Sequence, residues 1–242
     1  MGTFTYIDSD GAAHSLPAVR FGSLSGTDGN TGTVQTISNA DYSAVIKTRI
    51  SKTERTIALT IPVQAESAAA LETAAGTYLS WFRQSDAPAT LQYERDDGTC
   101  REVEVYVQQG YPVRTYESNT FCWIEVRFTA CSPYWTDTEE TAFKHNTAFV
   151  NDGDYPAECK LILSVTVRYV ALDGVQIMAF RDGAYMLTNY VTITDSSITA
   201  TDTSGNNILY KFTLGSQFPL IPIGEHTFYG CKGTFKKRWG HA

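Results

Sequence analysis

Long apolar runs, basic clusters and paired cysteines are all scarce in this sequence. No stretch approaches the roughly 18 apolar residues that a membrane span requires. The opening Met1-Gly2-Thr3-Phe4 has neither the basic n-region nor the apolar h-region of a signal peptide, so we expect no membrane insertion. The 26 acidic residues outnumber the 19 Lys and Arg, which gives a net charge of -7 and argues against a basic groove for nucleic acid. A pore through which DNA slides without binding remains compatible with this charge.

Cysteine and histidine are too few and too scattered to predict a disulfide framework or a metal site. The cysteines are odd in number and form no Cys-x-x-C pair: Cys100, Cys122, Cys131, Cys159 and Cys231. They alternate with apolar residues, so we expect reduced thiols on apolar strand faces, in a protein made in a reducing bacterial cytoplasm. The four histidines follow no ligand spacing, so we expect neither a metal nor an organic cofactor.

No catalytic signature is present, and we predict no catalytic, cofactor-binding or metal residue. The pair Asp96-Asp97 can be read as catalytic carboxylates, but its place before Gly98 favours turn formers. The glycine-rich stretch from Gly22 to Gly32 lacks the Gly-Lys-Ser/Thr of a phosphate loop and predicts a long flexible loop. We therefore expect a protein that is not an enzyme. A glycan-active enzyme stays an alternative, because carboxylates from separate strands can converge in space.

The residues that are abundant favour strands. Aromatic residues reach 12%, and apolar residues recur at every second position over 56–63 and again over 120–130. Asp96-Asp97-Gly98 separates two further alternating runs, which predicts a hairpin. One segment, 66–83, changes to a helical period. Its apolar face is Leu71, Ala74, Ala75, Tyr78, Leu79 and Phe82.

Pro133 marks the end of the first half, because proline cannot donate a ladder hydrogen bond. We place two domains, 1–140 and 141–242. The second reads as a β-sandwich of short strands. The expected strands are 159–163 continuing to 167, 175–180, 190–193, 198–200 and 209–212, with a turn at Asp173-Gly174. An exposed aromatic such as Trp239 or Tyr229 could bind sugar. A free-standing carbohydrate-binding module is therefore the alternative function, although core or interface roles for these rings are favoured.

Several motifs occur in the order found in one protein family. The sharpest is Phe-x-Ala-x-x-Pro-Tyr-Trp from Phe128 to Trp135. The others are the strand from Arg55 to Ile61, the hairpin from Leu91 to Gly98 with its return at Arg101-Glu102-Val103, the run from Asn151 to Ala157, and the run from Leu214 to His226. Together they resemble the distal tail proteins of long-tailed bacteriophages, the siphophage Dit family. His226 stands where that family usually has Asn, and the spacing at Ile221-Pro222-Ile223 also departs from the family pattern.

This resemblance implies a mainly β fold. The first domain would be a tail-tube-like β-sandwich or split barrel with one helix, and the second a galectin-like β-sandwich. Six copies would close into a ring around a DNA-conducting channel at the virion tail tip, and DNA would pass without specific binding. The implied partners are the tail tube protein and a Tal-like tail-tip protein, with a receptor-binding protein as a further candidate. The chain has no room for an inserted sugar-binding module, so a scaffold role is favoured.

Overall fold

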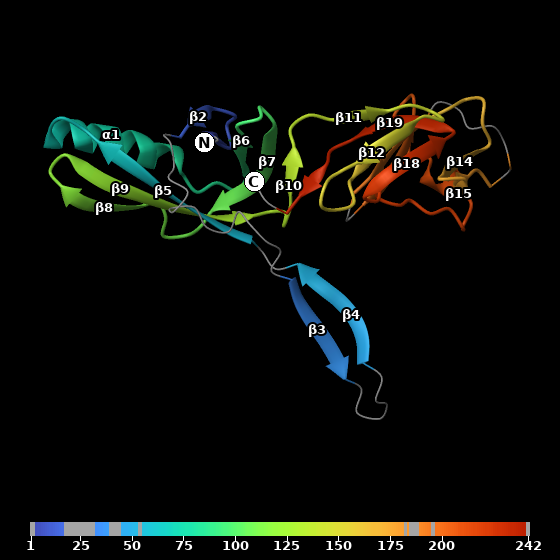
Figure 1. Ribbon diagram of the computed structural model, residues 1–242, viewed down its shortest axis with the longest axis horizontal. Coiled ribbons are helices and arrows are strands. Elements are labelled where there is room, and N and C mark those ends of the chain that lie inside the picture. The colour runs from blue at the N-terminus through green and yellow to red at the C-terminus, as the bar shows by residue number, and fades with distance from the viewer. Residues whose placement is uncertain are drawn as a thin grey trace. The chain divides into compact units, whose positions relative to one another are not determined.

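The computed structural model describes residues 3–16, 32–38, 45–52, 55–181, 183, 189–194 and 197–240. These residues form several antiparallel sheets with one α-helix, and no sheet among them closes into a barrel, which confirms the mainly β prediction (Figure 1). The chain divides into two compact units, Met1–Trp135 with Gly240–Ala242 and Thr136–Trp239. The sequence places its boundary a few residues later, after residue 140.

The first unit is built on one antiparallel sheet. Its strands are β1 (Thr3–Ile7), β2 (Ala13–Ser15), β5 (Arg55–Gln64), β6 (Ala89–Glu94), β7 (Cys100–Val107), β8 (Val113–Ser118) and β9 (Phe121–Ala130). The strands β2, β1, β6 and β7 follow one another in the sheet, and β9 comes next. One edge of β9 pairs with β5 along its whole length, while the other edge pairs with β7 and β8 at its two ends.

The helix α1 (Ala68–Trp81) covers one face of this sheet. It begins at Ser67, whose Oγ accepts a hydrogen bond from the N–H of Ala70 at 3.2 Å and caps the first turn. Its buried residues Leu71 and Ala75 face β5 and β9. Phe82, just after the helix, is also buried, and its ring centroid lies 6.0 Å from that of Phe128 in β9. The predicted helix therefore exists, and it is slightly shorter than the segment 66–83.

The period-two pattern of β5 and β9 also holds in the structure. Their predicted core residues are all at most 3% exposed, and these are Ile57, Leu59, Ile61, Val63, Cys122, Ile124, Val126 and Phe128. Two further strands, β3 (Gly32–Ser38) and β4 (Val45–Lys52), pair with each other and were not predicted. The predicted glycine-rich loop lies outside the described residues, except Gly32, which begins β3.

The second unit is a β-sandwich of two antiparallel sheets. The five-stranded sheet has the order β11 (Thr141–Phe143), β19 (Cys231–Phe235), β13 (Cys159–Leu163), β16 (Asn189–Ile193) and β17 (Ile198–Asp202). The four-stranded sheet has the order β12 (Ala148–Asn151), β18 (Gly224–Tyr229), β14 (Tyr169–Leu172) and β15 (Val175–Ala179). Two short strands, β10 (Trp135–Asp137) and β20 (Arg238–Trp239), belong to neither sheet of the sandwich but to the nine-stranded sheet that also contains β1 and β2.

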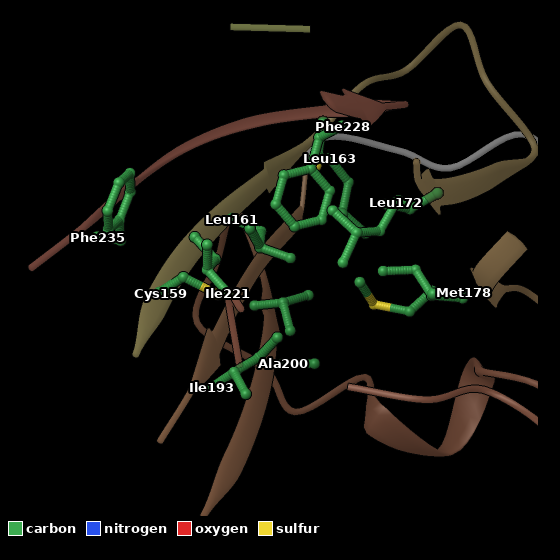
Figure 2. Packing of buried hydrophobic residues seen from close by; sticks show 14 of the residues in the cluster. Cys159, Leu161, Leu163, Leu172, Met178, Ile193, Ala200, Ile221, Phe228 and Phe235 are labelled. Atoms are coloured by element: carbon green, nitrogen blue, oxygen red, sulfur yellow. The ribbon is translucent and has the colours of Figure 1, made fainter. Parts of the chain in front are cut away.

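Side chains from both sheets fill the space between them. Leu161 of β13 and Met178 of β15 are at most 1% exposed, and both belong to this core (Figure 2). The ring of Phe143 lies 4.7 Å from that of Phe149 and 4.9 Å from that of Phe228, centroid to centroid. Stacked aromatic rings from facing sheets bury large apolar areas, which holds the sandwich together.

Two strand predictions in this unit are wrong. The strand beginning at residue 159 does not continue to 167, because β13 ends at Leu163 and a turn follows, in which Val165 is 52% exposed. The segment 209–212 is not a strand either, since Leu209–Lys211 forms a short 3₁₀ helix. The predicted turn at Asp173-Gly174 is confirmed. Both residues have positive φ, 52° and 81°, as a two-residue hairpin turn requires.

The run from Asn151 to Ala157 has a structural purpose. Asn151 is fully buried, and its Nδ2 donates to the carbonyls of Ile221 and Pro222, both at 3.1 Å. Its Oδ1 accepts from the N–H of Gly153 at 3.2 Å. A Cβ at Gly153 would lie 2.8 Å from the carbonyl oxygen of Arg238, so only glycine fits there. One buried amide thus joins two of the runs that carry the family resemblance.

Candidate functional site

The face of the first sheet opposite α1 is the candidate functional surface, and we call it the open face. Successive side chains of a strand point to opposite faces, so the residues that alternate with the buried core residues must point away from the helix. Within the described residues these outward positions are half-buried or exposed. They include Thr5, Thr56, Thr90, Gln92, Glu94, Glu102, Glu104, Tyr106, Trp123, Glu125, Arg127 and Thr129.

Charge is distributed unevenly between the two faces. The open face carries five carboxylates and one guanidinium among the described residues, namely Glu94, Glu102, Glu104, Glu117, Glu125 and Arg127. The other arginines of these strands point to the helix side. Arg55 and Arg101 are buried there, at 7% and 2% exposure, and Arg114 Nη1 forms an ion pair with Glu72 of α1 at 2.8 Å. The open face is therefore acidic.

Hydrogen bonds hold the polar groups of the open face in place. The Nε2 of Gln108 donates to Thr56 Oγ1 at 3.3 Å and to Thr129 Oγ1 at 3.1 Å, which ties β5 to β9. The Nε2 of Gln92 donates to Glu102 Oε2 at 3.2 Å.

The lone guanidinium of this face is already engaged. Arg127 Nε donates to Glu125 Oε1 at 2.8 Å, and that carboxylate raises the pKa of Arg127. The five carboxylates repel a phosphate backbone, and the single cation that could attract it is neutralised by Glu125.

The sequence pattern contained a signal for this face. In the strand from Cys100 to Val107, the valines that mark the core alternate with Glu102, Glu104 and Tyr106. The core positions of the valines imply that the acids share the opposite side. Which strands lie beside this one depends on the sheet pairing, so the acidic face as a whole is not evident from the sequence.

The pair Asp96-Asp97 forms a turn. The carboxylate of Asp97 accepts from the N–H of Thr99 at 2.9 Å and from its Oγ1 at 2.6 Å, and these bonds lower the pKa of Asp97. Gly98 follows with φ of 82°. This is a loop fixed by an aspartate and a glycine, as the turn interpretation predicts.

The cysteines agree only in part with the expected apolar strand faces. Cys122, Cys159 and Cys231 are buried, and burial raises the pKa of the Cys159 thiol to about 12. Cys100 is half-buried, and the prediction is wrong for Cys131, which is exposed just beyond the end of β9. All five are free thiols in the structure.

The two aromatic candidates for sugar binding differ in their surroundings. Trp239 is half-buried, and its Nε1 donates to Asp137 Oδ1 at 2.7 Å, so its ring is fixed against the short strand β10. Tyr229 is 37% exposed and lies beside Tyr169 and His145. The structure therefore leaves Tyr229 available as a surface ring.

Over the described residues, His, Cys, Asp and Glu form no group of three or more that could hold a metal ion. No helix in that part of the chain is long and apolar enough to cross a bilayer.

Comparison with known proteins gives one informative likeness. No family model matches the sequence, and no curated protein matches it. The fold is similar to the crystal structure of the Dit protein of phage SPP1, which is described as a paradigm of the hub adsorption apparatus in phages that infect Gram-positive bacteria. The TM-score is 0.68 at 12% identity, over 98% of this chain and 99% of that one.

Two structures of the phage P2 baseplate in its activated conformation, with Ca and with Sr, align over the whole of both chains. Their identities are 10% and 11% and their TM-scores are 0.47 and 0.48, too low to support an argument. The SPP1 likeness spans both units. This chain therefore has a fold similar to that of the SPP1 Dit protein.

Proposed function

We propose that this chain is a structural hub protein of a phage tail, six copies of which form a ring that joins the tail tube to the tail tip and the host-adhesion apparatus. The observation that carries this proposal is the likeness to the SPP1 Dit protein, because it covers 98% of the chain and includes both units. A short chance resemblance in one sandwich would not extend over two units.

The open face is the part of the ring that we assign to the DNA channel. Five carboxylates and a row of threonines on this face would present negative charge and hydroxyls to the passing duplex. Like charges repel phosphates, so DNA would slide without specific binding. A basic lumen would instead hold the DNA by releasing its counterions and slow its ejection.

The two domains would divide the work. We assign ring closure to 1–140, because an open sheet can satisfy its edges by pairing with the next copy. We assign an outer, self-contained position to the sandwich 141–242, whose core is complete within one chain. The partners would be the tail tube protein, a Tal-like tail-tip protein and a receptor-binding protein. The chain would catalyse no reaction, and it would be made in the bacterial host cytoplasm before assembly into the virion tail tip.

Charge reversal on the open face tests the channel assignment. The variant Glu94→Lys/Glu104→Lys replaces two exposed carboxylates, and the control Glu66→Lys/Glu139→Lys makes the same charge change at exposed positions elsewhere. Assembled rings of each are mixed with linear duplex DNA at about 50 mM salt in a gel-shift assay. We expect only the first variant to retain DNA, and to release it by about 200 mM salt, because binding through phosphates falls steeply with salt.

Equal retention by both variants would show that net charge alone matters. No retention by either would place the open face away from the DNA. Both outcomes contradict the channel assignment without touching ring formation, which is measured separately by native mass.

A further inference from the structure

Three exposed aromatic rings lie together in the second unit, two on the four-stranded sheet and one, His145, in the loop between β11 and β12. Tyr169 begins β14 and Tyr229 ends β18, and they are 39% and 37% exposed. Their strand neighbours Val170 and Phe228 are at most 1% exposed, so the tyrosines point to the outer side of the sandwich. The centroids of the two tyrosine rings lie 5.2 Å apart, and the ring of His145 lies 5.0 Å from that of Tyr229. We call these three residues the aromatic strip.

The turn at Gly230 holds the strip in position. Gly230 has φ of 87°, and a Cβ there would lie 2.3 Å from the carbonyl oxygen of Tyr169, so the two backbones are in close contact. The carbonyl of Gly230 also accepts from the N–H of Ser164 at 2.9 Å. Rings carried by neighbouring, hydrogen-bonded backbone lose little freedom when a ligand binds.

The same turn fixes the tautomer of His145. The N–H of Gly230 donates to His145 Nδ1 at 2.9 Å, so Nδ1 must carry a lone pair. The neutral imidazole therefore has its proton on Nε2, and the exposed side chain presents that N–H as a donor. The strip thus combines apolar ring surface with an N–H donor and two phenol groups.

We propose that the aromatic strip binds a hexopyranose unit of a polysaccharide. One side of a pyranose ring is a patch of C–H groups that packs on an aromatic ring, while the hydroxyls at its rim need hydrogen-bond partners. Tyrosine offers both an apolar body and a polar tip, and the Nε2–H of His145 supplies a donor at the end of the strip. A purely apolar partner would leave these three polar groups unpaired, which favours a sugar. This inference stands whether or not the chain forms a ring.

Affinity electrophoresis of the full-length protein tests this inference. Native gels contain dextran, barley β-glucan or galactomannan, which are uncharged and together present gluco, galacto and manno rings. We expect at least one glycan to retard the wild-type protein. Tyr229→Ala and Tyr169→Ala should each weaken binding about tenfold or more, and Tyr229→Phe, which keeps the ring, should retain most of it. Tyr106→Ala in the first unit is the matched control, because Tyr106 is also 39% exposed.

Thermal unfolding of each variant confirms that it is folded. If Tyr229→Ala does not fold, Tyr169→Ala at the end of its strand decides the question alone. Absence of retardation by all three glycans overturns the proposal, as does equal loss of binding in Tyr106→Ala. A change of native mass in the strip variants without any glycan binding shows a contact between protein chains, and this outcome also overturns it.

Discussion

Replacement of Asn151 by Ala should destabilise the second unit selectively. Its amide is fully buried and links the chain at Gly153 to the carbonyls of Ile221 and Pro222. Removing the amide does not affect these groups equally. The carbonyl of Ile221 still accepts from the N–H of Ala157 at 2.9 Å, and the carbonyl of Tyr155 loses only a long bond of 3.4 Å. The N–H of Gly153 and the carbonyl of Pro222 lose the closer contacts that Asn151 supplies.

The magnitude follows from those two groups. A buried donor or acceptor left without a partner costs about 1–3 kcal/mol. Pro222 is half-buried, so its carbonyl falls at the low end of that range. We expect a loss of about 2–4 kcal/mol in the free energy of unfolding of the second unit. For a unit of this size, about 1 kcal/mol lowers Tm by roughly 4–8 °C, so the transition should fall by about 10–30 °C.

Differential scanning calorimetry of the full-length protein measures this effect, because two units can unfold in separate transitions. Asn119→Ala is the control, since Asn119 is exposed and such surface changes usually stay within about 0.5 kcal/mol. Asn151→Asp should be no better than Ala, because its second oxygen would face two carbonyls. If Asn151→Ala leaves both transitions within about 2 °C of the wild-type protein, the account of this motif is refuted.

Two further predictions concern a glycine pair and the thiols. Gly233→Ala should give insoluble or strongly destabilised protein, because its Cβ would lie 2.1 Å from the carbonyl oxygen of Lys160. Gly76→Ala, in open space on α1, should instead raise the free energy of unfolding by roughly 0.5–1 kcal/mol. Thermal unfolding of both variants separates the effect of close packing from a general effect of glycine. A thiol reagent at pH 8 should modify exposed Cys131 first and spare buried Cys159, because a pKa of about 12 keeps the Cys159 thiol protonated. After unfolding without reductant, thiol counting should give five thiols per chain, and a count of three or fewer would reveal disulfides.

Much of the fold could be predicted from the sequence where one physical rule governs a segment. The strands β5 and β9 alternate strictly because one side of each is buried under α1, so period two is enough to place them. The turn Asp173-Gly174 requires positive φ at both positions, and its residues reveal it directly. The motif from Asn151 to Ala157 could be matched to a family before its hydrogen bonds were known.

The remaining features depend on contacts between distant segments. Val165 and Val167 read as a continuing strand, but Ser164 Oγ accepts from the N–H of Thr166 at 3.4 Å, a local contact that favours a turn after Leu163. The segment Leu209–Lys211 has strand-forming residues, yet Asn207 Oδ1 accepts from the N–H of Leu209 and favours a helical turn instead. The aromatic strip joins His145, Tyr169 and Tyr229, which no local pattern connects.

The acidic open face required the sheet pairing as well. Glutamates on β6, β7 and β9 share one side only because of the register of those strands. The sequence shows the alternation within a strand but not which strands are neighbours. For the same reason Cys131 could be mistaken for a core residue, since its position just beyond the end of β9 depends on where the pairing stops.

Native mass spectrometry of the full-length protein at high concentration, with negative-stain imaging of the same sample, tests the central proposal most directly. The account predicts a species of about six times 26.7 kDa that appears as a ring with a central hole. A mass of one or two chains at every concentration, with no ring in the images, would contradict it.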